Sequence, residues 1–163
     1  MRSAAAGDTV PFAASFQGDF TITFGTGPGG TDDLFFSDDG LASLLGWSDV
    51  DGHSTTRPIP TDPLCSEIVT DRVIVTAANG DELWLVNSGE DCLDFSVPGH
   101  TFIRCSGTFN VAGGTGRFRG ATGSGQFAVV AEVTGFVGPT VLSIIIVSLP
   151  APPSRVRLAV FGS

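Results

Sequence analysis

Apolar and polar positions alternate with a period of two over most of this sequence, and Gly, Pro, Asn and Asp interrupt the alternation at intervals. The plainest case runs from Phe16 to Phe24, where Phe, Gly and Ile occupy every second position and Gln, Asp and Thr lie between them. Successive side chains of a strand point to opposite faces, so this stretch predicts a half-buried β-strand. The following "TGPGGTDD", residues 26–33, predicts a loop.

Three other segments have less regular patterns. Residues 32–47 fit either a short helix, capped by Asp32 or Asp38, or a turn followed by a strand, and we favour the strand. Residues 51–63 carry three prolines near their end and predict a long connection. The apolar run Val141–Leu149 is about half as long as a membrane-spanning helix and predicts a buried strand.

The clearest hairpin is "RVIVTAANGDELWLV", residues 72–86. Asn79 and Gly80 form a strong two-residue turn signal, because both central residues of the favoured turn need a positive φ. This turn fixes the register and places three pairs opposite each other: Thr76 and Leu83, Val75 and Trp84, Arg72 and Asn87. Both faces of the hairpin are then largely apolar.

A sheet with two apolar faces has to bury both of them. No segment predicts a helix longer than about ten residues, so no helical layer is expected to cover the sheet. We therefore expect an all-β fold, a single antiparallel closed β-barrel with little helix, whose lumen is filled or holds a ligand and whose outer face is covered by another subunit. The whole chain, residues 1–163, is expected to be one domain, with residues 1–9 as a flexible N-terminal segment.

Three cysteines allow two disulfide pairings. The hairpin register makes Cys65 a diagonal neighbour of Cys92 on the same face, whereas a second hairpin around residues 97–100 places Cys92 opposite Cys105. A two-residue Pro-Gly turn suits a tight hairpin poorly, so we predict a Cys65–Cys92 disulfide and a buried Cys105 thiol. With no His at ligand spacing, the cysteines predict no metal site.

Composition narrows the range of partners. Acidic residues number 17 against 8 basic ones, for a net charge of −9, which argues against nucleic acid and anionic membranes as partners. The first twelve residues lack an apolar signal core but are rich in small residues, as expected after removal of a signal peptide. We expect a secreted or extracytoplasmic protein.

The most distinctive stretch is "VAGGTGRFRGATGSGQF", residues 111–127. It lacks the Lys of a phosphate-binding loop, and an alternating pattern typical of strands lies on both sides of it. It therefore predicts a glycine-rich crossing between two strands, with Phe118 turned inward as a plug. Arg117 and Arg119 either bind an anion or, more commonly for such residues, pair with surface acids.

Residues 107–127, "GTFNVAGGTGRFRGATGSGQF", resemble the signature of the allene oxide cyclase and dirigent-type barrels and of secreted bacterial proteins of similar build. "GDTVPFAASF" (7–16) and "AANGDELW" (77–84) are similar to further segments of these proteins. The resemblance implies a bacterial protein with an eight-stranded antiparallel barrel, an apolar lumen, and a homodimeric or homotrimeric assembly.

In the plant cyclases a Phe and an Asn two residues later line the pocket. Phe12 matches the Phe, but Ala14 occupies the Asn position, and the position of a further pocket Cys falls near Ala42. The resemblance thus implies the fold, and shared chemistry does not follow from it.

Several residues are candidates for catalysis. Glu132 is a lone carboxyl in an apolar strand, where it either points into the lumen as a general acid or base or alternates outward, which we favour. Arg72 and Asn87 either polarise a carbonyl group or pair with each other across the strands. His53 and His100 lie among Asp, Gly and Pro with no nucleophile motif nearby, so hydrolase chemistry is not indicated.

Candidate ligand-binding residues are Phe12, Trp84, Trp47 and Phe118, although core packing is the commoner role of Trp in strands. The acidic pairs at 32–33, 38–39 and 49–51 indicate at most a loose surface calcium site, since the other ligands of an EF-hand loop are missing. No cofactor is expected.

Two functions remain open from the sequence. The first is a small-molecule barrel that binds an apolar, unsaturated ligand in its lumen and acts as a cyclase or isomerase by confining the shape of its substrate. The second is a non-catalytic secreted structural or binding module with a packed lumen. A cavity of roughly 300 Å³ or more with convergent polar groups favours the first.

Overall fold

The computed structural model describes residues 9–138, 140–146 and 154–157. Within these ranges the chain is all-β, with two 3₁₀ turns and no α-helix. This confirms the expected all-β, antiparallel class. The elements are β1 (Thr9–Phe12), β2 (Ala14–Thr23), η1 (Pro28–Gly30), β3 (Asp32–Ala42), β4 (Gly46–Ile59), β5 (Asp62–Ala77), β6 (Glu82–Asp94), β7 (Phe102–Gly114), η2 (Gly116–Phe118), β8 (Thr122–Val137), β9 (Thr140–Ile146) and β10 (Ser154–Arg157).

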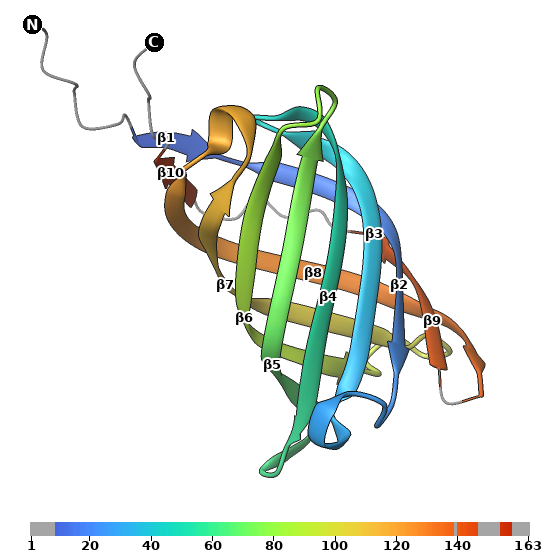
Figure 1. Ribbon diagram of the computed structural model, residues 1–163. Helices are drawn as coiled ribbons and strands as arrows, with labels where there is room; N and C mark the ends of the chain where they lie inside the picture. The colour runs from blue at the N-terminus through green and yellow to red at the C-terminus, as the bar shows by residue number, and fades with distance from the viewer. Residues whose placement is uncertain (1–8, 139, 147–153, 158–163) are drawn as a thin grey trace, which may run out of the picture.

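The strands form one strongly curled antiparallel sheet (Figure 1). From β2 to β8 each strand pairs with the next one along the chain. The next strand, β9, pairs with β8 along one edge and with β2 along the other. The short strands β1 and β10 pair with each other and extend the sheet beside β8. The fold is therefore barrel-like, and the ten strands of the described residues exceed the expected eight by this short extension.

The inside of the curled sheet, here called the lumen, holds the hydrophobic core. Inward positions alternate with outward ones, most clearly at the ends of β2 and β5, where buried residues occupy every second position. One cluster of buried residues includes Phe12, Val75, Leu83 and Phe118, and a second is built from Phe20, Ile22, Ile103 and Ala131.

The β5–β6 hairpin corrects the predicted register. The connection has three residues, 78–80, since the Ala77 amide donates to the Asp81 carbonyl and the Gly80 amide donates to the Ala77 carbonyl. Only Gly80 has a positive φ, at 85°, and no non-glycine residue does among those described. Asn79 instead accepts a hydrogen bond from the Asp81 amide. The extra residue shifts the pairing by one.

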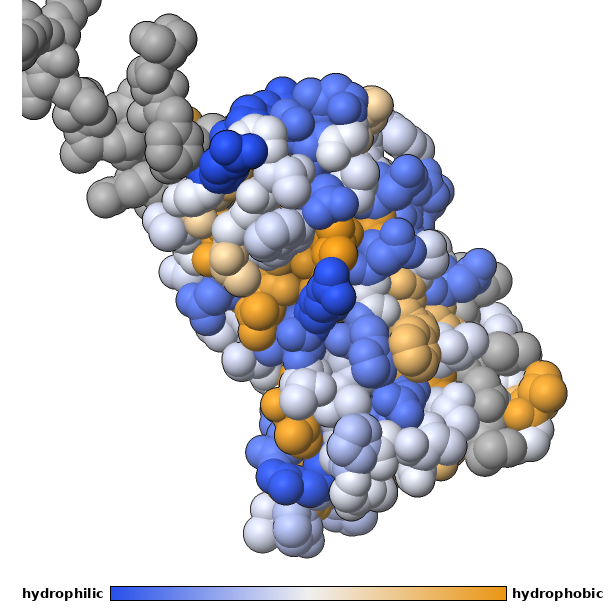
Figure 2. All heavy atoms as spheres, viewed as in Figure 1, coloured by the Kyte–Doolittle hydropathy of each residue, from blue (hydrophilic) through white to orange (hydrophobic). Residues whose placement is uncertain are grey.

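This shift changes which side chains share a face. Val75 lies opposite Leu83 rather than Trp84, and both are buried in the lumen. Trp84 and Val86 lie on the outer face and are exposed. Figure 2 shows hydrophobic residues among polar ones on the face over β4 to β7. The hairpin thus has two apolar faces as predicted, but only the inner one is buried within the chain.

Two segment predictions change as well. Residues 51–63 are no long connection, because β4 runs through most of them and pairs with β3 and β5. The three prolines lie at the end of the segment, next to the tight turn at residues 60–61. Few backbone N–H groups are needed there for hydrogen bonds between strands, so proline is tolerated. The segment 32–47 is extended as favoured, but its strand ends at Ala42 and the next one begins at Gly46.

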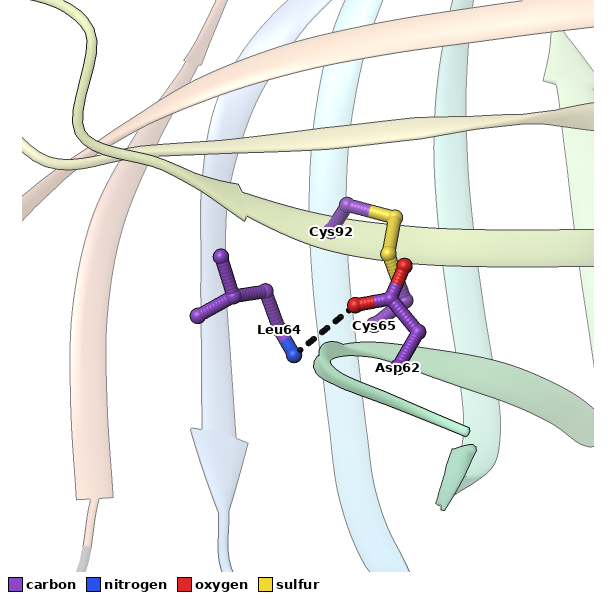
Figure 3. Close-up of a disulfide and its surroundings, with 4 residues drawn as sticks. All are labelled: Asp62, Leu64, Cys65 and Cys92. Atoms are coloured by element: carbon purple, nitrogen blue, oxygen red, sulfur yellow. Dashed lines mark hydrogen bonds between the residues drawn. A yellow bond between two sulfur atoms is a disulfide. The ribbon is translucent and has the colours of Figure 1, made fainter. Parts of the chain in front are cut away.

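The predicted disulfide is confirmed. Cys65 and Cys92 lie directly opposite each other on β5 and β6, with their Cα atoms 4.1 Å apart (Figure 3). Asp62 accepts a hydrogen bond from the Leu64 amide close by. Cys105 is a free thiol on β7, where it lies opposite Asp91 rather than Cys92.

The glycine-rich run is the predicted crossing between two strands, β7 and β8. Phe118 is fully buried at 0 % exposure and plugs the lumen at this end, which confirms its predicted placement. Gly114 permits this approach, since a Cβ there would lie 2.7 Å from the Phe118 Cβ. Arg117 Nε lies 3.7 Å from Asp81 Oδ2. Arg117 thus forms an ion pair with a surface acid, which was the predicted alternative to anion binding.

Two predictions concern segments that lie partly outside the described residues. Residues 1–8 of the expected N-terminal segment lie outside the described residues, and Thr9 begins β1. The apolar run 141–149 forms β9 as far as Ile146, and its last residues lie outside as well. None of the helices found in the described ranges is long and apolar enough to cross a bilayer.

Candidate ligand-binding cavity

A cavity of about 290 Å³ lies in the lumen between the two buried clusters. Strands β2 to β8 all contribute to its wall, which is mostly apolar. Six phenylalanines line it: Phe12, Phe16, Phe20, Phe36, Phe109 and Phe127. Two further lining residues, Ala13 and Gln126, are exposed, which indicates that the cavity lies close to the surface on their side.

A few polar side chains interrupt this apolar wall. They come from strands β3 to β8 and are Asp38, Ser54, Thr56, Asp71, Asn87, Cys105 and Gln126. Two of them are carboxyl groups, and no Arg or His is present among the described lining residues. The cavity is therefore an apolar space with acceptor groups and without a positive charge.

Asp38 is the most isolated of these groups. It is only 8 % exposed, and its Oδ1 atom has no hydrogen-bond partner among the described residues. Gly18 lies opposite on β2, and a Cβ there would lie 2.5 Å from Asp38 Oδ1, so a glycine leaves the carboxyl group its space. Desolvation, with the nearby carboxylates of Asp19, Asp39 and Asp51, raises the pKa of Asp38 to about 7.

Asp71 is held by hydrogen bonds from two neighbouring strands. The Ser54 hydroxyl of β4 donates to Asp71 Oδ2 at 2.5 Å, and the backbone N–H of Asn87 on β6 donates to Asp71 Oδ1 at 2.6 Å. Burial still raises the pKa of Asp71, because desolvation outweighs these hydrogen bonds. Asp71 is thus a fixed acceptor on the wall of the cavity.

Two more titratable groups lie inside the sheet beyond Asp71. Asp91 is buried, its Oδ1 lacks a hydrogen-bond partner in the described part of the chain, and desolvation raises its pKa to about 6. It faces Cys105 across β6 and β7. Burial first, and then Asp91 and Asp71, raise the pKa of the Cys105 thiol, which makes it a poor nucleophile.

The three predicted catalytic residues are not brought together. Glu132 is not on the cavity wall; its side chain is 41 % exposed and lies 2.5 Å from His100, consistent with the favoured outward orientation. Arg72 lies in a hollow on the outer face, near His53. Asn87 alone lines the cavity, and its hydrogen-bond partner is Asp71 rather than Arg72.

The predicted ligand-binding residues also separate into groups. Phe12 lines the cavity, and Phe118 packs in the cluster that closes one end of the lumen. Trp84 and Trp47 are 38 % and 56 % exposed and do not line the cavity. The Trp84 indole N–H donates to Glu82 at 2.7 Å on the outer face, a position that follows from the corrected register.

Sequence reasoning missed Asp38 and Asp71, although a signal was present. In β3 the alternation places Asp38 in phase with Leu34 and Phe36, and in β5 it places Asp71 in phase with Val73. A carboxyl group in phase with apolar residues is expected on the buried face. No group of three or more metal-ligating side chains is found in the described ranges.

The chain was also compared with known proteins. No protein-family model matches it, and no curated protein is similar to it. The fold and the cavity are therefore the basis of the functional argument.

Proposed function

We propose that the protein binds an apolar small molecule in the lumen of a closed eight-stranded barrel formed by β2 to β9. The observation that carries this proposal is the cavity of about 290 Å³, whose wall is apolar apart from a few convergent polar groups. The two pairings of β9, with β2 and with β8, support the closed form.

The size of the cavity limits the ligand. An engineered cavity of roughly 150 Å³ holds benzene, so about 290 Å³ suits a ligand of about a dozen non-hydrogen atoms. Phenylalanine rings supply flat apolar contacts, while Ser54, Asp71 and Asn87 form a fixed polar group that orients the ligand.

Catalysis of a cyclisation or isomerisation extends the same proposal. A rigid lumen favours one folded shape of a flexible, unsaturated substrate, and Asp38, with a pKa of about 7, is a proton donor or acceptor suited to neutral pH. The resemblance to allene oxide cyclase and dirigent-type barrels agrees with this reaction class. A non-catalytic module is the alternative if the lumen takes no ligand.

Location and assembly belong to the proposal too. The Cys65–Cys92 disulfide is compatible with an oxidising compartment, and we infer that the protein acts outside the cytoplasm. The exposed apolar residues on the outer face, Trp84 and Val86 among them, support a homodimer or homotrimer that covers this face.

Isothermal titration with 2-tetralol, a neutral bicyclic alcohol of about a dozen heavy atoms, tests binding in the lumen. Val129→Trp places an indole in the cavity and should abolish binding, because Val129 lines the wall. Val97→Trp makes the same substitution at an exposed position in the loop between β6 and β7 and should leave binding unchanged. Absence of binding, or equal loss in both variants, would overturn the proposal.

A further inference from the structure

We propose that the ligand of this cavity carries one cationic nitrogen, as in a protonated hydrophobic amine, and that Asp38 is the group that binds the cation. This inference rests on the proposed function and adds the chemical class of the ligand. It starts from a polar atom on the cavity wall, Asp38 Oδ1, that has no hydrogen-bond partner among the described residues.

Asp38 Oδ1 has no hydrogen-bond partner in the described chain, although the residue is more than nine-tenths buried and lines the cavity. Buried carboxyl groups are normally hydrogen-bonded, since taking one out of water without a partner is energetically unfavourable. Gly18 keeps the space beside this oxygen free of a side chain. The unpaired atom and the cavity together indicate that a ligand atom completes the site.

The charges around the cavity select a cation. Asp38 and Asp71 are both on its wall, and no described lining residue carries a positive charge. Asp19, Asp39 and Asp51, on β2, β3 and β4, add to the negative potential at Asp38. An anionic ligand would be repelled here, whereas a protonated amine would form a charge-assisted hydrogen bond with the carboxylate.

The rest of the wall fits an organic cation better than a metal ion. Six phenylalanines line the cavity, and the face of an aromatic ring attracts a cation through its quadrupole. No cluster of three metal-ligating side chains occurs among the described residues, and a divalent ion needs more oxygen ligands than one free carboxyl group offers. An amine on an apolar skeleton satisfies both the carboxyl group and the phenylalanines.

A matched ligand pair tests the inference: 2-aminotetralin, which is protonated at pH 7.5, against 2-tetralol, which has the same skeleton and is neutral. We expect the amine to bind at least tenfold more tightly by isothermal titration, as hydrogen bonds to charged groups contribute more than neutral ones. Asp38→Asn should remove this preference and change the affinity for the alcohol less than threefold. Asp49→Asn, an exposed carboxyl on β4, is the matched control and should retain the preference.

The affinity for the amine should also fall at least tenfold from pH 8 to pH 5.5, because Asp38 then has to lose a proton before it binds the cation. The charges of Asp19, Asp39 and Asp51 raise the pKa of Asp38 in addition to desolvation. The other titratable groups on the cavity wall are Asp71 and Cys105. The alcohol should show no comparable dependence.

The outcomes separate this inference from the proposed function. Equal binding of amine and alcohol, or a preference that survives Asp38→Asn, would overturn the cationic ligand and leave lumenal binding standing. If neither compound binds, or if Val129→Trp has no effect on either, lumenal binding itself is wrong and the inference falls with it.

Discussion

The buried carboxyl group of Asp38 makes the stability of the protein depend on pH in a defined direction. The pKa of Asp38 rises from an ordinary value of 3.8 to about 7 in the folded chain, mainly through desolvation. Below about pH 3 the group is protonated in both states and has no effect on unfolding. As the pH rises to 7 the unfolded chain loses this proton first, so the folded state loses stability, and the full cost is present above pH 7.

The size of this cost follows from the shift. About three pKa units at 1.36 kcal/mol per unit correspond to about 4 kcal/mol. Asp38 lines a cavity rather than packed protein, so solvent screening reduces the cost to about 2–3 kcal/mol. Asp38→Asn, which keeps the shape of the side chain and cannot ionise, should therefore be more stable than the parent by this amount at pH 8.

Urea denaturation followed by fluorescence, at pH 3 and pH 8 without ligand, measures the difference. The parent and Asp38→Asn should have nearly equal free energies of unfolding at pH 3 and diverge as the pH rises. Other buried carboxyl groups, Asp71 and Asp91, cancel in the comparison because both proteins contain them. Asp49→Asn should follow the parent within about 0.5 kcal/mol at both values, as exposed substitutions do. A parallel pH dependence in Asp38→Asn and the parent would refute the reasoning.

Three further predictions concern other parts of the fold. Replacing Cys65 and Cys92 with Ser should lower the free energy of unfolding by about 3 kcal/mol, and a reductant should then have no further effect; equal stability of parent and variant would contradict this. Phe118→Ala should cost about 3–5 kcal/mol in urea denaturation, and Phe118→Leu distinctly less, because the ring fills the end of the lumen. Iodoacetamide at pH 8 should label Cys105 far more slowly in the folded protein than in urea, and equal rates would show that burial does not suppress the thiolate.

Local patterns predicted the strands and their crossing well. Alternation identified β2, and the glycine-rich run with Phe118 identified the link from β7 to β8, because each signal lies within one short segment. The Cys65–Cys92 pair was also predictable, since its two strands are joined by one hairpin.

The predictions about the β5–β6 register failed because of a single residue in a turn. Asn79-Gly80 is compatible with a two-residue or a three-residue connection, and the backbone takes the second, with only Gly80 at a positive φ. A shift of one residue gives each β6 side chain a different partner on β5 and turns it to the other face of the sheet. Trp84 therefore lies outside the cavity. The candidate site built on that register was therefore less predictable than the strands themselves.

The stability of the fold does not explain why the lumen contains an unpaired carboxyl group. Where a buried carboxyl group lacks a partner, an apolar residue of similar size usually gives a more stable protein. The end of the lumen at Phe118 shows that this chain can be packed that way, since Phe118, Val75 and Leu83 are fully buried in one apolar cluster. Asp38 instead keeps an unpaired acceptor next to an open space, at a cost that a bound ligand would offset under the proposed function. The position of this residue is thus the strongest argument for the proposed binding in the lumen.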